Sequence, residues 1–486
     1  MSDALAGLVP KPVWEHFAQI AAIPRPSKKE ERIAAHVIEI ATRNGLAWER
    51  DQTGNIVVRK PASPGKESSP MVALQSHLDM VCEKNREIRH DFDSDGIQLV
   101  RTDGHIKAKG TTLGSDNGIG VAAALSVMLD RTLVHGPMEF LFTVDEETGL
   151  TGANGLKAGF LKSRVLLNLD SEEEGALYVG CSGGRDTLLR LGIEREPAPH
   201  GFVPLGLAVT GLRGGHSGLD INAGRGNAIK LLARALWNMA KSNDVQLSHF
   251  EGGSKRNAIP RESEAVVYVR GERLKAFRDA VDHLKEVFRN EYSTVEPNLQ
   301  IDVPQNKPSA SGQVFKKADQ EKLLSLLYAL PHGVISMSAD IPGLVETSTN
   351  VATIQTDAQT AVVGTSQRSS INTALEDIVN RVAIIGRLAG AIPEHTDGYP
   401  GWKPNMNSHS LKVTKETYKQ LYGKEPAVKA IHAGLECGII GEKYQGIDMV
   451  SFGPTIEGAH SPDERVEIAT VQKFWDLLTG VLKNLS

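Results

Sequence analysis

The sequence predicts an α/β protein: a mixed sheet flanked by helices, interrupted by a long inserted α+β region. Short apolar segments before residue 180 end repeatedly in histidine or acidic residues, as strands do at a ligand-binding sheet edge. The pattern changes near Gly183, and a strand followed by a histidine-bearing loop returns near the end of the chain. Because 486 residues exceed one typical core, we expect a domain made of residues 1–186 plus 400–486 and an inserted domain, 187–399.

Composition excludes several classes of partner. The chain has 40% hydrophobic residues, 23% charged residues and a net charge of −5, without a long basic run, so we expect no nucleic acid and no membrane partner. No apolar segment has membrane length, and the N-terminal segment has neither the basic nor the apolar region of a secretion signal. The three scattered cysteines, Cys82, Cys181 and Cys437, argue against a disulfide framework. We therefore predict a cytoplasmic protein.

The first 80 residues predict two helices followed by strands. An amphipathic segment, 11–23, stops at two prolines, and Ser27 with Glu30 forms a capping-box pattern that begins a helix ending near Asn44. The apolar run 71–74 predicts a buried strand that delivers His77 and Asp79 to its carboxyl end. Two further strands are predicted at 46–49 and 56–59.

A glycine-rich segment, residues 110–120, follows. Its spacing fits neither the dinucleotide fingerprint nor the Walker pattern, so we interpret it as a tight turn that presents Asp116 before a helix, 121–130. The strands predicted next end at Glu146-Glu147 and at Asp170; their ranges are 138–144 and 165–169. This recurrence of acidic groups at strand ends and in a turn is the strongest signal in the chain.

The middle region predicts two successive β-α-β-β-α units of roughly 100 residues each. The first has elements at 204–209, 228–240, about 248, 265–269 and 274–290, and the second at 299–303, 320–329, 351–355, 360–363 and 375–388. After it, elements are predicted at 411–422, 434–440, 448–452 and 471–485. We place this last segment, which carries His460, back in the sheet of the first domain.

Two histidines and three acidic residues near strand ends suit a pair of zinc-like ions, because imidazole and carboxylate are borderline-to-hard ligands. Asp116, in its glycine-flanked turn, is the natural bridge between two ions. In the pair Glu146-Glu147, one carboxylate can bind metal while its neighbour takes a proton from water. Asp79 can accept a hydrogen bond from the distal nitrogen of His77. The alternative interpretation is a chance scatter of surface acids and an ordinary hydrogen-bonded histidine.

Several motifs together resemble the co-catalytic zinc aminopeptidase, dipeptidase and deacylase group. They are Ser76-His77-Leu78-Asp79, Gly114-Ser115-Asp116-Asn117-Gly118, Asp145-Glu146-Glu147-Thr148-Gly149, Asn168-Leu169-Asp170 and Gly458-Ala459-His460. Within that group, Ile431-His432-Ala433-Gly434-Leu435-Glu436-Cys437-Gly438 and Tyr399-Pro400-Gly401-Trp402 are similar to the bacterial aminoacyl-histidine dipeptidases. The resemblance implies a zinc-exopeptidase-like sheet with an inserted lid domain.

The resemblance also implies roles. One zinc ion would be held by His77 and Asp170, the other by Glu147 and His460, with Asp116 bridging them. Glu146 would be the general base and then the general acid, and Asp79 would orient His77. The implied reaction is hydrolysis of unblocked dipeptides, Xaa-His included, at two zinc ions, with cobalt or manganese as substitutes.

In the inserted domain, Gly214-Gly215-His216-Ser217-Gly218 matches the motif whose histidine stabilises the oxyanion, commonly in a neighbouring subunit's active site. The alternative is that His216 is only a turn residue between glycines. Arg368 can clamp the carboxylate of a dipeptide, or can be a solvated surface charge. Asn257 and Asn350 are further candidates for substrate contacts.

Three questions stay open at this point. His432 and Glu436 lie one helical turn apart and could pair with each other, and we expect a structural role for both and no ligand role. A doubled lid could imitate a dimer interface within a monomer, or enlarge a dimer; we expect a homodimer. The alternative functions are an N-acyl-amino-acid deacylase and a catalytically silent metal-binding scaffold, and Glu146 argues against the second because a silent site needs no general base.

Overall fold

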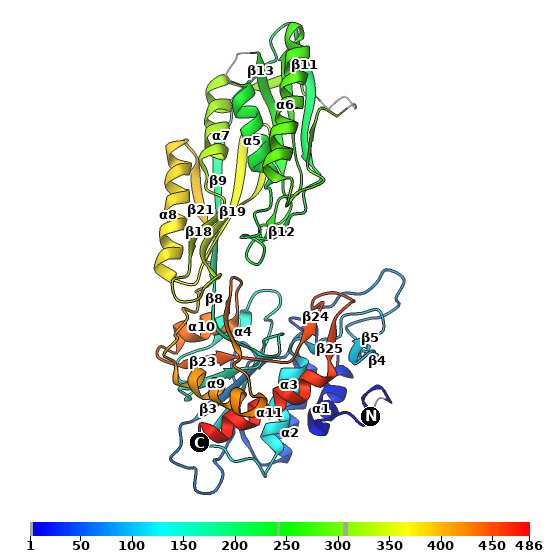
Figure 1. Ribbon diagram of the computed structural model, residues 1–486, viewed down its shortest axis with the longest axis vertical. Coiled ribbons are helices and arrows are strands. Elements are labelled where there is room, and N and C mark those ends of the chain that lie inside the picture. Colours follow the sequence, from blue (N-terminus) through cyan, green and yellow to red (C-terminus); the bar gives the residue numbers. More distant parts are fainter. Residues whose placement is uncertain (1–2, 241–243, 305–309) are drawn as a thin grey trace. The chain divides into compact units, whose positions relative to one another are not determined.

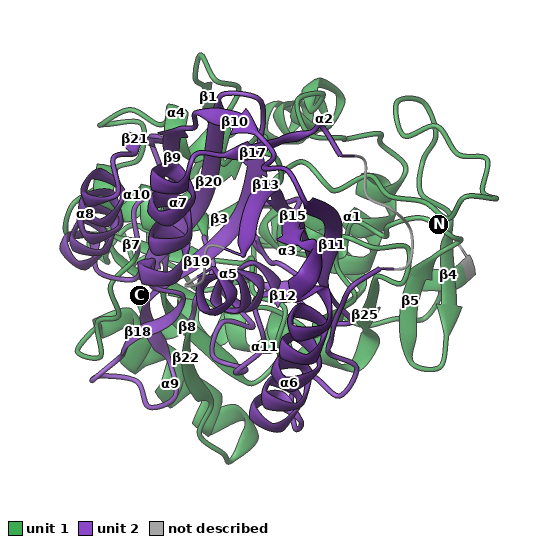
Figure 2. Ribbon diagram, turned by 90° about the horizontal axis from the view of Figure 1, so that it is seen from above, with its two compact units in different colours: residues 1–181, 402–430, 435–486 green, residues 182–401, 431–434 purple. Residues whose placement is uncertain are grey.

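The structure is a computed structural model that describes residues 3–240, 244–304 and 310–486 (Figure 1). Contacts within the chain divide it into two compact units (Figure 2). Unit 1 comprises Met1–Cys181, Trp402–Ala430 and Leu435–Ser486, and unit 2 comprises Ser182–Gly401 and Ile431–Gly434. The domain boundaries at 186/187 and 399/400 stay a prediction.

In the described part of unit 1, eight strands form one mixed sheet in the order β1-β2-β6-β3-β7-β23-β8-β22. The strands are β1 (Ala47–Arg50), β2 (Ile56–Lys60), β3 (Val72–His77), β6 (Met138–Thr143), β7 (Val165–Asn168), β8 (Ala176–Cys181), β22 (Ala427–Ile431) and β23 (Asp448–Ser451). The central strands β6, β3, β7 and β23 run parallel. A second sheet contains β4 (Leu99–Thr102), β5 (His105–Ala108), β24 (Ile456–Glu457) and β25 (Arg465–Glu467).

Helices cover the larger sheet. They are α1 (Lys11–Ala21), α2 (Glu31–Arg43), α3 (Ser115–Leu129), α4 (Thr151–Gly155), α9 (His409–Tyr422), α10 (Glu436–Lys443) and α11 (Ile468–Asn484), with a short 3₁₀ helix at Asp3–Leu5. Every residue of β3, β6 and β7 is buried, as expected of parallel strands covered on both faces. The alanine-rich α3 packs on β3 and against α1. Parallel strands share one carboxyl edge, so the residues that follow β3, β6 and β7 converge there.

Unit 2 is built on a nine-stranded sheet in its described residues, ordered β16-β11-β15-β13-β19-β20-β9-β21, with β18 also paired to β19. These strands are β9 (Gly183–Gly192), β11 (Phe202–Thr210), β13 (Val245–Gly252), β15 (Ser263–Arg270), β16 (Gln300–Asp302), β18 (Gly333–Met337), β19 (Val345–Thr356), β20 (Thr360–Ser369) and β21 (Ile392–His395). Two small ribbons pair β10 (Arg195–Pro197) with β17 (Gln313–Phe315) and β12 (Gly215–His216) with β14 (Ala258–Ile259).

Among the residues described in unit 2, four helices run alongside this sheet (Figure 1). They are α5 (Ala228–Met239), α6 (Leu274–Tyr292), α7 (Lys317–Ala329) and α8 (Asn372–Leu388), and a 3₁₀ turn, Gly271–Arg273, precedes α6. The core of unit 2 joins apolar side chains of these helices and strands, such as Leu232, Phe277 and Phe250, each at most 5% exposed. Burial of this apolar surface holds the helices to the sheet.

The predicted fold class is confirmed: the molecule is mixed α/β with an inserted α+β segment. The last part of the chain returns to the first sheet as predicted, since β23 lies between β7 and β8. In unit 2 the strand expected to open the second β-α-β-β-α unit, β16, pairs instead with β11. Strand β9 pairs with β20, and the sequence analysis, which noted only a change of pattern near Gly183, predicted no strand there.

The capping box predicted at Ser27 is wrong. The residue that precedes α2 is Glu30, which makes no side-chain cap. Ser27 Oγ instead donates to Asp79 Oδ2 at 2.8 Å. This is a tertiary contact, which the local sequence does not predict. All three cysteines are free, in agreement with the composition. Among the described residues, none of the helices combines the length and apolarity that crossing a bilayer requires.

Candidate metal centre

The carboxyl edge of the unit 1 sheet gathers the predicted metal ligands. In the register of the parallel strands, His77 lies opposite Thr143, and Gln75 lies opposite Asn168. The chain that follows each strand therefore brings Glu146-Glu147 and Asp170 next to His77.

Asp116 lies between two imidazoles. Its Oδ1 is 3.0 Å from His77 Nε2, and its Oδ2 is 3.2 Å from His460 Nε2. On one side His77 Nε2 also lies 3.2 Å from Asp170 Oδ1, and on the other His460 Nε2 lies 3.0 Å from Glu147 Oε2. One carboxylate that gives each oxygen to a different histidine has the geometry of a bridging ligand.

Three groups of possible metal ligands overlap here. Each has its ligand atoms within 4.8 Å of one another; the groups are His77-Asp116-Asp170, Asp116-Glu147-His460 and His77-Glu146-Glu147. Glu147 Oε1 is buried without a hydrogen-bond partner, which is costly unless a cation satisfies it. Two imidazoles and three carboxylates are a donor set that divalent zinc-like ions accept. The residues present therefore fit a pair of divalent cations.

A fourth acidic group has other partners. Glu30, Asp79 and Asp145 also lie within 4.8 Å of one another. Their oxygens accept hydrogen bonds from the protein: Glu30 from the Asp145 amide at 2.9 Å, Asp145 from two threonine hydroxyls, and Asp79 from Ser27. These donors stabilise the carboxylates without an ion.

Asp79 joins the two halves of the centre. Its Oδ1 lies 3.3 Å from His77 Nδ1, and it accepts the backbone N–H groups of Glu146 at 3.1 Å and Glu147 at 3.2 Å. Burial opposes its charge, but hydrogen bonds and charge from His77 lower the pKa of Asp79 to about 2. Asp79 is thus an ionised group that fixes the His77 ring and the Glu146-Glu147 turn.

Negative charge is crowded at this edge. Burial, followed by the charges of Asp116 and Glu147 acting against that of His77, raises the pKa of Asp170 to about 6. Burial, with Asp170 and other carboxylates nearby, raises the pKa of Glu146 well above its ordinary value. Hydrogen bonds to Asp116 and Glu147 raise the pKa of His460 to about 11. The cluster thus attracts positive charge, which divalent cations would supply.

Unit 2 holds a cluster of different character around His216. The amides of Gly218 and Leu219 donate to His216 Nδ1 at 3.2 and 3.1 Å, which leaves Nε2 as the protonated nitrogen. Burial, and then the charge of Arg368, lower the pKa of His216 to about 4. The ring is therefore a neutral N–H donor at neutral pH, so His216 is more than a turn residue.

Arg368 is 7% exposed, so the alternative of a solvated surface arginine is wrong. Its Nη1 donates to the Tyr399 hydroxyl at 2.8 Å and its Nε lies 3.4 Å from Ser217 Oγ. Asn350 donates to the Ala258 carbonyl at 2.8 Å, and its Oδ1 is buried without a partner. Asn257 is exposed, and its carbonyl accepts the Ser217 amide at 2.9 Å.

The helical turn expected to join His432 and Glu436 is wrong. Helix α10 begins at Glu436, so the two residues do not share a helix turn. His432 Nε2 lies 2.7 Å from Ser348 Oγ, and Glu436 Oε2 accepts Gln75 Nε2 and Thr143 Oγ1, both at 2.7 Å.

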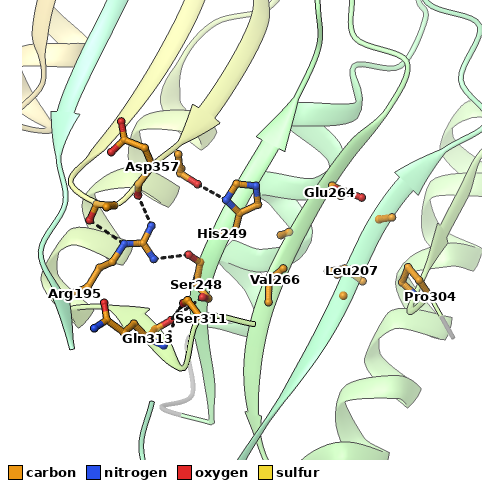
Figure 3. A pocket seen from close by; sticks show the side chains of 15 residues that line it. Arg195, Leu207, Ser248, His249, Glu264, Val266, Pro304, Ser311, Gln313 and Asp357 are labelled. Carbon is orange, nitrogen blue, oxygen red and sulfur yellow. Dashed lines mark hydrogen bonds between the residues drawn. The ribbon is translucent and has the colours of Figure 1, made fainter. Parts of the chain in front are cut away.

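A hollow of about 750 Å³ on the unit 2 sheet is a different kind of site (Figure 3). Its Arg195 donates Nη1 to the Ser248 carbonyl at 2.7 Å and Nε to the Ala358 carbonyl at 3.0 Å. His249 Nδ1 lies 2.9 Å from Thr356 Oγ1, and His249 Nε2 lies 3.1 Å from Glu251 Oε2. Its charged groups are thus engaged with the protein, and none of the described ligand groups lines it.

Comparison with known proteins shows the family of this chain. The model of Peptidase family M20/M25/M40 matches residues 73–484. The chain belongs to this family. It is 44% identical over 481 residues to the cytosol non-specific dipeptidase of Escherichia coli K12, with 99% of each chain covered.

Two solved structures share the fold of this chain. The aminoacylhistidine dipeptidase of Vibrio alginolyticus superposes with a TM-score of 0.92 at 44% identity, covering 99% of this chain and 97% of that one. The aminopeptidase PepT of Bacillus cereus, at 17% identity and a TM-score of 0.57 over 98% and 99%, shows the fold alone.

The structure of this M20 peptidase brings together all seven residues that the sequence analysis placed in unit 1. They are His77, Asp79, Asp116, Glu146, Glu147, Asp170 and His460. Sequence reasoning missed two buried groups around them, Arg25 and Glu464, and gave Glu436 only a structural role. Arg25 and Glu464 bind mainly backbone groups, and such contacts leave no residue pattern in a single sequence.

Proposed function

We propose that this M20 peptidase hydrolyses unblocked dipeptides, Xaa-His included, at a pair of zinc ions. The observation that carries the proposal is Asp116, which lies between His77 and His460 with Glu146 alongside. The relatives named above, a non-specific dipeptidase and an aminoacylhistidine dipeptidase, favour this reaction over removal of an N-acyl group.

We assign one ion to His77 and Asp170 and the other to Glu147 and His460, with Asp116 shared. When bound, two divalent cations lower the pKa of water and polarise the scissile carbonyl. Cobalt and manganese share the preference for imidazole and carboxylate ligands, so they are the expected substitutes.

Glu146 is the proposed general base. Its raised pKa suits a carboxylate that takes a proton from water and then donates it to the leaving amine. The Glu146 amide is held by Asp79 at 3.1 Å, which fixes the start of the side chain. The carboxylate of the adjacent residue, Glu147, would bind a metal ion.

In unit 2, we assign to His216 the hydrogen bond that stabilises the oxyanion, because its Nε2 is protonated while the ring is neutral. Arg368 would bind the dipeptide carboxylate through its guanidinium, and Asn350 and Asn257 would contribute further polar contacts. His216 acts in cis or in trans; a cytoplasmic homodimer is the assembly we propose, and sedimentation tests it.

The experiment that tests the function uses the purified full-length protein with an Ala-His dipeptide. We expect hydrolysis, its loss on chelation, and its return on adding zinc. An N-acetylated analogue serves as the control for deacylase activity and is expected to be hydrolysed poorly. Absence of hydrolysis of every unblocked dipeptide tested in excess zinc would contradict the proposal.

A further inference from the structure

Glu464 is a buried carboxylate that the proposed reaction does not use. It is 2% exposed and lies four residues after His460, on the loop that joins β24 to β25. One oxygen, Oε2, accepts the backbone N–H groups of Leu113 at 2.7 Å and Gly114 at 2.9 Å. The other, Oε1, accepts the Ser115 N–H at 2.7 Å and the Ser115 hydroxyl at 2.6 Å.

The hydrogen bonds of Glu464 extend to Asp116, a proposed metal ligand. Asp116 N also lies 3.3 Å from Glu464 Oε1, so the carboxylate binds the N–H groups of four consecutive residues. They form the start of α3, whose N-cap, Gly114, has a φ of +69° and no side chain to cap the helix. The first N–H groups of a helix need acceptors from elsewhere and favour an anion. Glu464 supplies that anion from 348 residues further along the chain.

Arg25 holds the same turn through its carbonyl. The buried guanidinium donates Nη1 to the carbonyls of Leu78 at 2.9 Å and Asp79 at 2.6 Å, and Nη2 to the carbonyl of Gly114. A Cβ atom at position 114 would lie 2.6 Å from Arg25 Nη2. The Asp116 turn is therefore held to the end of β3 by Arg25 and to the His460 loop by Glu464.

The two histidines differ in how firmly they are held. His77 belongs to the buried strand β3, its side chain is 1% exposed, and Asp79 lies against its Nδ1. His460 lies on a loop, at a φ of +62°, and its side chain is 56% exposed. Among the described residues near His460 in sequence, Glu464 makes the buried contacts that join this loop to the turn bearing Asp116.

We propose that Glu464 is a positioning residue that fixes His460 relative to Asp116 and so sets the affinity for the cation held by Glu147 and His460. This inference rests on the proposed dinuclear function. The ligand atoms of a cation must be placed accurately around it. A loosened His460 loop therefore weakens the binding of the cation at Glu147 and His460 more than the binding of the cation at His77 and Asp170. Partners that orient metal ligands are typically worth 10–100-fold in affinity.

The test compares Glu464→Gln with Asp463→Asn. Both remove one negative charge by an isosteric amide, but Asp463 is exposed. Metal-free full-length protein is titrated with zinc against a chromophoric chelator, which gives two stepwise binding constants. In Glu464→Gln we expect one constant, that of the cation at Glu147 and His460, to fall at least tenfold and the other to change less than threefold. Asp463→Asn should leave both constants unchanged.

Two outcomes would overturn the inference: both constants in Glu464→Gln equal to those of the wild type, or both constants falling by the same factor. If Glu464→Gln does not fold, Ser115→Ala removes one donor to the same carboxylate, and we expect the zinc affinity to fall in only one of the two constants. Equal affinities in Ser115→Ala and wild type would then overturn it. The wild-type titration is separate: fewer than two zinc ions bound there contradicts the proposed function itself.

Discussion

The two polar clusters of this peptidase have opposite electrostatic character. In unit 1, carboxylates crowd together, and the pKa values of Asp170 and Glu146 are raised by burial and by like charges. In unit 2, burial and Arg368 lower the pKa of His216 to about 4 and that of His432 to about 3. The first cluster is suited to bind cations, and the second offers neutral and cationic donors to anions. Variants in unit 1 should therefore change metal binding or proton transfer, and variants in unit 2 should not change metal content.

The largest effect is expected at Glu146. Glu146→Gln keeps the shape of the side chain but removes the base, so we expect kcat to fall about 10³-fold. Metal analysis of the same protein should still find two ions per chain, because Glu146 is not among the assigned ligands. Glu147→Gln is the matched control and should lose metal. A variant at Glu146 that loses an ion would reverse the assigned roles of the two glutamates.

His216→Ala should lower kcat by about 10²-fold, as removal of one oxyanion donor does, with two ions still bound. Steady-state kinetics and metal analysis check both statements. Mixing His216→Ala chains with Glu146→Ala chains then separates two arrangements: activity regained on mixing requires His216 to act across subunits, and none regained requires it to act within its own chain. Loss of metal from His216→Ala would contradict the division between the two clusters.

The sequence was sufficient to predict that these side chains lie together in unit 1, because most follow a short apolar segment or lie in a glycine-bounded turn and because their motifs resemble a known family. The same reasoning failed at Ser27, whose hydroxyl donates to Asp79, and at β9, where no strand was predicted. Glu464 left no signal, because its partners are mainly backbone N–H groups some 350 residues away. Local patterns predict elements, and contacts of this kind arise only when distant segments pack.

A smaller effect is expected at Arg368. Arg368→Lys keeps the charge but loses the planar fork that binds a carboxylate through two hydrogen bonds, so KM for dipeptides should rise about tenfold with kcat less affected. A C-terminally amidated dipeptide should be a poor substrate for the wild type and show little further loss with the variant. Arg381→Lys, on the exposed face of α8, is the surface control. An unchanged KM for Arg368→Lys would remove the assigned carboxylate contact.

The last effect concerns stability in acid and not catalysis. Burial, and then the charge of Lys230, lower the pKa of His332 in unit 2 to about 4. The unfolded chain takes up this proton near pH 6.5, so stability falls as pH drops from 6.5 towards 4. At pH 5 this proton uptake lowers the free energy of unfolding by about 2 kcal/mol. Denaturant unfolding at pH 7 and pH 5 measures it, and His332→Asn should reduce the difference. If the free energy of unfolding changes equally between pH 7 and pH 5 in the wild type and in His332→Asn, His332 is not the group responsible.

The account depends most on Asp116 as a carboxylate shared by two cations. A crystal of the zinc-loaded protein, measured at the zinc absorption edge, tests this directly through its anomalous difference map. We predict two peaks flanking Asp116, one beside His77 and Asp170 and the other beside Glu147 and His460. A single peak, or zinc bound instead at Glu30, Asp79 and Asp145, would contradict the account.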